Sequence, residues 1–226
     1  MKVFLSPNAS LNITDNLISN TNNGIYIRRE SDDTSSLKNL VISNNAINFK
    51  TKGIILEYIP YSIIKGNRLS PLSGYGGTIG VQMIECSYSV INDNLIDSLS
   101  IGCNITNSNS CNFNGNLLFS CTTAYKLVGG DNHCFSDKFK NCQTVFSLTS
   151  PPSSQINKHR CYNSDFDNCT TIKDTQGVLI RMYGNSSPID GTWDVGHTII
   201  NNTPTLESYE KWVYSSSTWK PINQIL

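Results

Sequence analysis

Short segments that mix apolar and polar residues in one fixed order recur along the chain. Each has an aliphatic or aromatic residue, two polar residues, an asparagine and two further residues. The segments are ITDNLI around Asn16, ISNNAI around Asn45, IKGNRL around Asn67, INDNLI around Asn94 and FNGNLL around Asn116. The asparagines are 29, 22, 27 and 22 residues apart. A unit this short has no room for a crossover helix, so the pattern predicts a stacked solenoid of strands.

The repeat continues in a degenerate form toward the C-terminus. The segment CFSDKFKNC at 134–142 returns as CYNSDFDNC at 161–169. We place the sixth and seventh anchors of the series at Lys138 and Asp165. The whole series predicts an all-β fold, a right-handed parallel β-helix of about seven coils in which the anchor asparagines stack as a ladder. A leucine-rich repeat is the competing architecture, but its LxxLxL spacing is absent.

A second strand follows each anchor, where the chain reads GIYI, GIIL, GVQM, GCNI and AYKL. Successive side chains of a strand point to opposite faces, which predicts two sets of positions. The inward set is Ile25, Ile27, Ile54, Leu56, Val81, Met83, Cys103, Ile105, Tyr125 and Leu127. The outward set is Tyr26, Arg28, Ile55, Glu57, Gln82, Ile84, Asn104, Thr106 and Lys126. Insertions at 30–36 and 70–77 adjoin the outward row, and we expect them to form the walls of a groove.

The periodicity stops near Gly177, which predicts two parts. Residues 1–176 form the β-helix, and residues 177–226, which contain all three tryptophans, form a small C-terminal β module. The open edge of a first coil normally needs a cover. We therefore expect a partner or a preceding domain to cover the N-terminal coil.

Charge and cysteine content exclude several classes of function. The formal net charge is 0, with 17 basic and 17 acidic residues, so the electrostatic attraction that drives nucleic-acid binding is missing. No apolar stretch is long enough to cross a membrane. The eight cysteines form no CxxC pair, so we expect reduced thiols in the core, with no metal and no cofactor. A weakly charged surface rich in Asn and Ser suits neutral polar partners such as sugars.

The carboxylates beside the expected groove are the candidate catalytic groups. Glycoside hydrolysis needs two carboxyl groups about 5 Å or about 6.5 to 9.5 Å apart, and coils about 4.8 Å apart permit such spacings. Glu57 is the candidate acid, with Glu85 or Asp33 as its partner. The alternative is that these are solvated charges, with Arg28 and Glu57 forming a weak exposed pair. The candidate substrate-binding residues are Tyr26, Arg28, Gln82, Asn104 and Tyr75.

The repeats and the C-terminal segment GTWDVGHTIINNTP…WVYSSSTWK resemble the receptor-binding tailspikes and capsule depolymerases of tailed bacteriophages. The β-helix part of the resemblance is shared with pectate-lyase-like enzymes, and the C-terminal segment is its more specific part. The matching residues there are Gly191, Thr192, Trp193, Gly196, Asn202, Pro204, Trp212, Trp219 and Lys220. Two features depart from that family: Pro204 is one residue closer to Asn202, and SSS replaces a longer Gly-rich insert.

The resemblance implies a stable homotrimer in the virion, joined to the phage tail through a missing N-terminal domain. Such a protein folds in the host cytoplasm and acts outside the cell on a bacterial capsule or O-antigen polysaccharide, by hydrolysis or β-elimination. Catalytic residues in that family have no fixed motif, so none is carried over. Two alternatives stay open: a non-catalytic module that only binds glycan, and a structural trimeric stalk whose seam uses the outward row.

Overall fold

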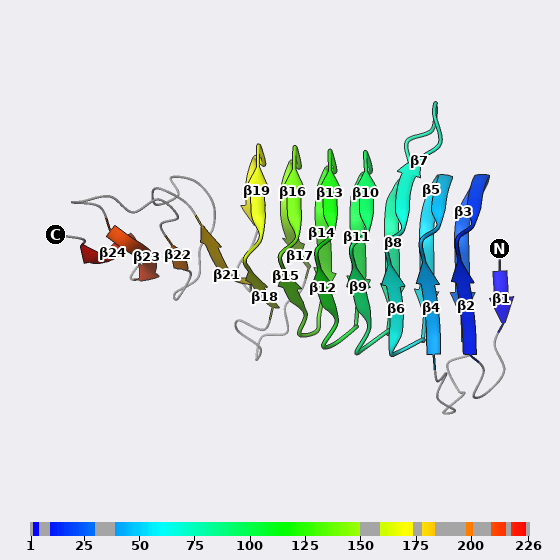
Figure 1. Cartoon of the computed structure of the whole chain (residues 1–226), viewed down its shortest axis with the longest axis horizontal. Helices are drawn as coiled ribbons and strands as arrows, with labels where there is room; N and C mark the ends of the chain where they lie inside the picture. The colour runs from blue at the N-terminus through cyan, green and yellow to red at the C-terminus, as the bar shows by residue number, and fades with distance from the viewer. Residues whose placement is uncertain are drawn as a thin grey trace.

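The computed structural model describes residues 2–4, 10–29, 39–149, 159–173, 178–183, 198–200, 209–215 and 218–224. Every regular element in these ranges is a β-strand, and the strands lie side by side in a row of stacked coils (Figure 1). None of the described elements is a helix able to span a bilayer. Neighbouring coils pair in parallel, as the repeat predicts, and the fold is a right-handed parallel β-helix.

Two parallel sheets form the walls of the solenoid. The first contains β1, β3, β5, β7, β8, β10, β11, β13, β14, β16, β17, β19 and β20. The two longest strands, β3 (Leu17–Arg28) and β5 (Ala46–Glu57), join two sides of this sheet, because β5 pairs with β7 and with β8. The remaining bounds are β1 Lys2–Phe4, β7 Arg68–Pro71, β8 Ile79–Ile84, β10 Leu95–Asp97, β11 Ile101–Thr106, β13 Leu117–Phe119, β14 Thr123–Val128, β16 Lys138–Lys140, β17 Thr144–Leu148, β19 Asp165–Asp167 and β20 Thr171–Lys173.

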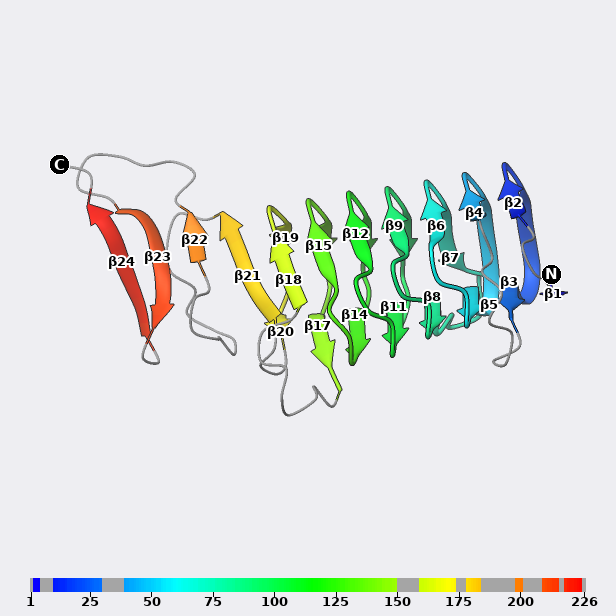
Figure 2. The same cartoon turned by 90° about the horizontal axis from the view of Figure 1, so that it is seen from below.

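The second sheet forms the other side of each coil and extends into the C-terminal part (Figure 2). Its strands are β2 Ser10–Thr14, β4 Asn39–Ser43, β6 Ser62–Lys65, β9 Val90–Asn92, β12 Asn112–Asn114, β15 His133–Phe135, β18 His159–Tyr162, β21 Val178–Tyr183, β22 Thr198–Ile200, β23 Tyr209–Ser215 and β24 Thr218–Gln224. Pairing is parallel as far as β22 and antiparallel from β22 to β24. Strands β21 and β22 therefore extend the parallel sheet past Gly177, and the expected division into two parts stays a prediction.

The predicted inward residues form the core. All ten are at most 3% exposed, and the cluster continues into the aromatic side chains Phe113, Phe139 and Phe146 around Tyr125. The outward residues between them are half-buried or exposed, with one exception. Ile55 belongs to the outward row by register, yet it is only 5% exposed.

A ladder of asparagine side chains runs through the stacked coils at the turn that precedes the strands β3, β5, β7, β10 and β13. From Asn45 onward, each side-chain oxygen accepts from the backbone and side-chain nitrogens of the preceding anchor. Asn67 Oδ1, for example, lies 3.0 Å from Asn45 N and 2.9 Å from Asn45 Nδ2. The side-chain nitrogen also donates to a backbone oxygen, as Asn67 Nδ2 does to Ile42 O at 2.9 Å. The predicted ladder is confirmed for Asn16, Asn45, Asn67, Asn94 and Asn116.

The two degenerate anchors were placed one residue too late. Asn116 donates to Asp137 Oδ1 from both its backbone and its side chain, so the sixth rung is Asp137. Lys138 instead pairs with Leu117, and Asp165 pairs with Lys138. The seventh position therefore falls to Ser164, which is buried beside Cys134. The interval from Asn116 to Asp137 is 21 residues, one fewer than the 22 residues from Asn94 to Asn116.

Candidate functional site

The outward row lies on one flat side of the solenoid, along β3, β5, β8, β11 and β14. Register places Tyr26, Ile55, Gln82, Asn104 and Lys126 in one column across five consecutive coils. A neighbouring column begins with Arg28 and Glu57. We call six polar residues of these columns the outer face: Tyr26, Arg28, Glu57, Gln82, Asn104 and Lys126. The structure thus brings together five of the eight predicted site residues.

Glu57 is held by two residues of the preceding coil. Tyr26 Oη donates to Glu57 Oε2 at 3.0 Å, and Arg28 Nε lies 3.6 Å from the same oxygen. Partial burial, followed by the hydrogen bond and charge of Glu57, raises the pKa of Tyr26. The Arg28 guanidinium also lies over the Tyr58 ring, 5.8 Å from its centroid. Because the Arg28 side chain is 47% exposed, the ion pair itself contributes little to stability.

Two amides of the outer face lack complete hydrogen bonding. Gln82 Oε1 and Asn104 Oδ1 are buried oxygens that accept no hydrogen bond in the described part of the chain. Their side chains as a whole are half-buried and stand in register on β8 and β11. An unsatisfied buried acceptor costs about 1–3 kcal/mol. The outer face therefore has two amide oxygens for which the described part of the chain provides no hydrogen-bond donor.

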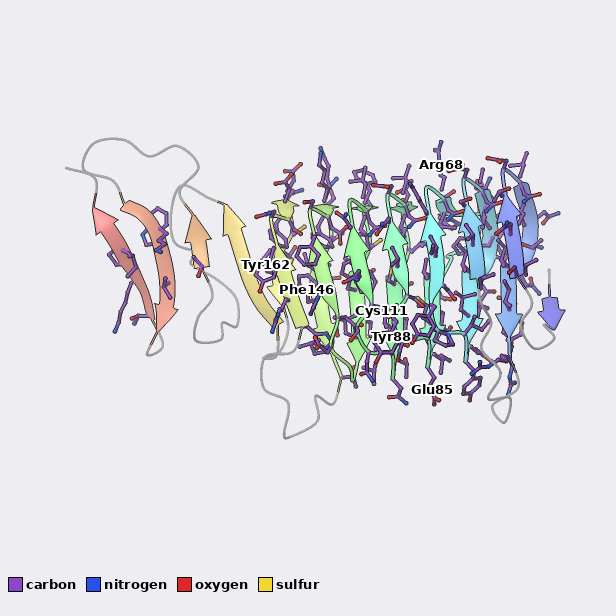
Figure 3. The ribbon with its side chains drawn as sticks, turned by 60° about the horizontal axis from the view of Figure 1, so that its bottom comes forward. Arg68, Glu85, Tyr88, Cys111, Phe146 and Tyr162 are labelled. Carbon is purple, nitrogen blue, oxygen red and sulfur yellow. The ribbon has the colours of Figure 1, made fainter. Side chains whose placement is uncertain are left out.

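The other predicted site residues lie elsewhere. Glu85 is exposed at the turn after β8, where it lines a pocket with Tyr88, and Figure 3 shows both on the side of the solenoid opposite Arg68. Tyr75 is on the long turn after β7, where Lys50 Nζ lies 4.8 Å from its ring centroid. Asp33 lies outside the described residues. Glu57 interacts with the first coil while Glu85 follows a strand of the third, so pairing of their carboxylates stays a prediction.

The cysteines are free thiols, and seven of the eight are buried. Cys134 and Cys161 are paired in register, and their sulfur atoms are 3.4 Å apart. Burial raises the pKa of Cys86 to about 12 and of Cys111 to about 11, so these groups stay protonated near neutral pH. They fill the core as small apolar side chains.

A family model described as "Periplasmic copper-binding protein (NosD)" matches residues 2–145. The chain belongs to this family. The match covers the stacked coils and supports the β-helix part of the expected resemblance. It ends before the C-terminal segment on which the tailspike resemblance mainly depends, so that assignment stays a prediction. No curated protein and no solved structure matches the chain.

The described side chains do not form the copper centre that the family description would suggest. Copper(I) favours thiolate and thioether ligands, and a cysteine must lose its thiol proton to bind as a thiolate. The thiols of Cys86 and Cys111 are instead buried and held in the protonated form. Within the described ranges there is no group of three or more His, Cys, Asp or Glu side chains that could hold a metal ion.

Proposed function

We propose that this protein recognises a bacterial surface polysaccharide on the outer face. The observation that carries the proposal is the column of half-buried polar side chains across consecutive coils, with two amides whose hydrogen bonds are incomplete. Sugar hydroxyls donate and accept hydrogen bonds, so they can complete the bonding of side-chain amides. An amide can also rotate to present either its oxygen or its nitrogen.

The balance of charged side chains on the outer face supports a polar ligand of low charge. The whole chain has a formal net charge of 0. On the face itself Arg28 is compensated by Glu57, which leaves Lys126 at one end of the amide column. Repeated coils would present similar groups to successive sugars of one chain, as solenoids do for extended ligands.

Cleavage of the polysaccharide is the finer part of the proposal. Glu57 Oε2 accepts a hydrogen bond from Tyr26 and lies 3.6 Å from Arg28 Nε, so two groups of the preceding coil hold this carboxyl in place. In this scheme Glu57 supplies the proton and Glu85 is its partner carboxylate. A homotrimer and a place in the phage tail are further proposals that follow only from the resemblance.

The test is incubation of the protein with a panel of capsule and O-antigen polysaccharides. Co-elution measures binding, fragment size measures cleavage, and ultraviolet absorbance of an unsaturated product separates elimination from hydrolysis. We expect Asn104→Ala to weaken binding about fivefold, the value of one hydrogen bond. The matched control is Asn112→Ala, an exposed asparagine on β12 in the second sheet.

The two variants separate the face from general surface effects. Truncation of Asn104 removes an amide oxygen that has no partner within the described chain, so the fold should tolerate it. Equal binding by the two variants would contradict the proposed face. Failure of the wild-type protein to bind any polysaccharide of the panel would contradict the proposed function, and binding without shortened fragments would exclude cleavage.

A further inference from the structure

A pocket of about 370 Å³ lies at the turns that end the outer-face strands. One wall is formed by Arg29 after β3, Glu85 after β8 and Asn107 after β11, which belong to the first, third and fourth coils. Tyr58 holds the same column in the second coil but does not line the pocket. The turns that lead on to the second sheet contribute Tyr61, Ser87 and Tyr88. We call this the corner pocket. It begins one residue beyond the Arg28 and Glu57 column and is therefore continuous with the outer face.

The backbone of the pocket carries an unusual set of side chains. Residues with positive φ are usually Gly, Asn or Asp, because a larger side chain crowds the backbone there. In the described chain most positive-φ positions follow this rule or hold serine. The exceptions are Tyr58, Tyr61, Glu85 and Tyr88, with φ between 55° and 61°, and all four are at this corner. Three of the four line the pocket.

The two pocket tyrosines form a stacked pair across neighbouring coils. Their ring centroids are 5.2 Å apart and their planes differ by 11°. Both side chains are largely exposed, Tyr61 at 57% and Tyr88 at 55%. In the next coil the same turn position holds Ser110, with φ of 54°. The fold therefore does not require tyrosine at this position, and the aromatic pair is a local addition to two coils.

We propose that the corner pocket binds a pyranose side branch of the polysaccharide whose backbone lies on the outer face. The inference rests on the proposed function, because it is the backbone on the outer face that would deliver a branch to the corner. The tyrosine pair offers an apolar surface to the C–H groups of a sugar ring. Glu85 and Asn107 supply an acceptor and an amide for its hydroxyls.

The polarity of the pocket favours an uncharged sugar. Its lining includes one cation, Arg29, and one anion, Glu85, so the formal charges cancel. An aromatic surface with a few polar groups is the usual composition of a small-ligand site, and the volume is within the range of about 300–1,000 Å³ for such sites. A second polysaccharide backbone is a poorer occupant, because the pocket ends at Asn107 while the outer face continues to Lys126.

The experiment uses saturation-transfer NMR of the full chain with the methyl glycosides of glucose, galactose, mannose and N-acetylglucosamine. The test variant is Tyr61→Ser with Tyr88→Ser, which copies the serine that the next coil carries at the same turn. The control is Tyr162→Ser, a half-buried tyrosine of β18 on the second sheet that lies outside the pocket. We expect saturation of ring C–H protons in the wild type and the control, and loss of at least about tenfold in affinity in the double variant.

Two results would overturn the inference: no saturation by any glycoside in the wild type, or equal saturation in the double variant. The polysaccharide panel separates this failure from failure of the proposed function. If the outer face binds the polysaccharide backbone but the corner pocket binds no side branch, the double variant keeps the full affinity for the panel polysaccharides. Asn104→Ala, in contrast, loses affinity for them. If only the function fails, the glycosides still saturate in the wild type and no polysaccharide binds.

Discussion

The fourth and sixth positions of the stacked ladder can be compared directly, because Asn94 and Asp137 occupy the same turn in different coils. Asn94 Nδ2 donates to Ile64 O and to Asn116 Oδ1, both at 3.0 Å. Asp137 cannot donate in this way, and its second oxygen instead accepts from Tyr125 Oη at 2.8 Å and Cys134 Sγ at 3.1 Å. The same backbone position is thus occupied by an amide where the surroundings are acceptors and by a carboxylate where they are donors.

The order of the ladder also explains why an acid ends it. Each asparagine from Asn45 to Asn116 accepts from the preceding anchor and donates to the next, so the amide dipoles point the same way. Their positive ends face Asp137, where a negative charge is favourable. Burial nevertheless dominates and raises the pKa of Asp137 to about 6, although the bonds from Cys134, Tyr125 and Asn116 lower it.

The largest expected effect on the free energy of unfolding comes from replacing a ladder asparagine with aspartate. In Asn67→Asp the new carboxylate would face Ile42 O and Asn94 Oδ1, which are acceptors at 2.9 and 3.0 Å. An uncompensated buried charge costs roughly 3–5 kcal/mol. We expect this loss in the free energy of unfolding at pH 7.5, measured by urea denaturation. The exposed Asn114→Asp is the control, and a loss no larger than in the control would remove the distinction between rungs.

A smaller effect of opposite sign is expected from Asp137→Asn. The folded pKa of about 6 lies above the ordinary aspartate pKa of 3.8, so between these values the folded state binds more protons than the unfolded state. Stability from this group is therefore full below about pH 4 and decreases until about pH 6. This difference in pKa between the folded and unfolded states corresponds to about 3 kcal/mol. We expect the variant to exceed the wild type by up to this amount at pH 7.5.

The pH series provides the check on Asp137. Unfolding midpoints should converge for Asp137→Asn and wild type at pH 4, while the exposed control Asp165→Asn follows the wild type throughout. Parallel curves for Asp137→Asn and wild type would show that the carboxyl does not titrate in this range.

The smallest effect is expected at the surface of the same coils. Lys140 Nζ lies 3.2 Å from Asp167 Oδ2, but the two side chains are 51% and 63% exposed. Such pairs contribute at most about 1 kcal/mol and are screened by salt. We expect Lys140→Ala to change the free energy of unfolding by less than about 0.5 kcal/mol. A loss comparable to that of Asn67→Asp would mean that surface charge, and not the ladder, holds these coils together.

Much of the fold follows from local sequence pattern. The recurrence of asparagine after two polar residues predicted the ladder, and the alternation of apolar and polar residues predicted the core. Both features depend on a repeat of residue types that can be read directly from the sequence. The misplacement of the sixth rung at Lys138 shows the limit of this reasoning. The interval between the fifth and sixth anchors is shorter by one residue, and the sequence gives no sign of this. Only the hydrogen bonds from Asn116 to Asp137 show it.

The candidate site was predicted less completely. The column of Tyr26, Gln82 and Asn104 followed from alternation, whereas Tyr61 and Tyr88 were missed. They are 27 residues apart, the same distance as the anchors Asn67 and Asn94. Extending the repeat from the strands into the turns would have aligned them, but the positive φ values that mark the corner are not visible in the sequence.

The sequence by itself determined the parallel solenoid, its inward residues and its polar outward row, because a short period of apolar and polar positions has few ways to bury its apolar half. Only the tertiary structure decided which turns lie together, and so placed Arg29, Glu85 and Asn107 around one pocket. The physical reason is that stacking brings residues some twenty to thirty positions apart to within one strand spacing, about 4.8 Å. Which side chains then share a pocket depends on the length of each coil.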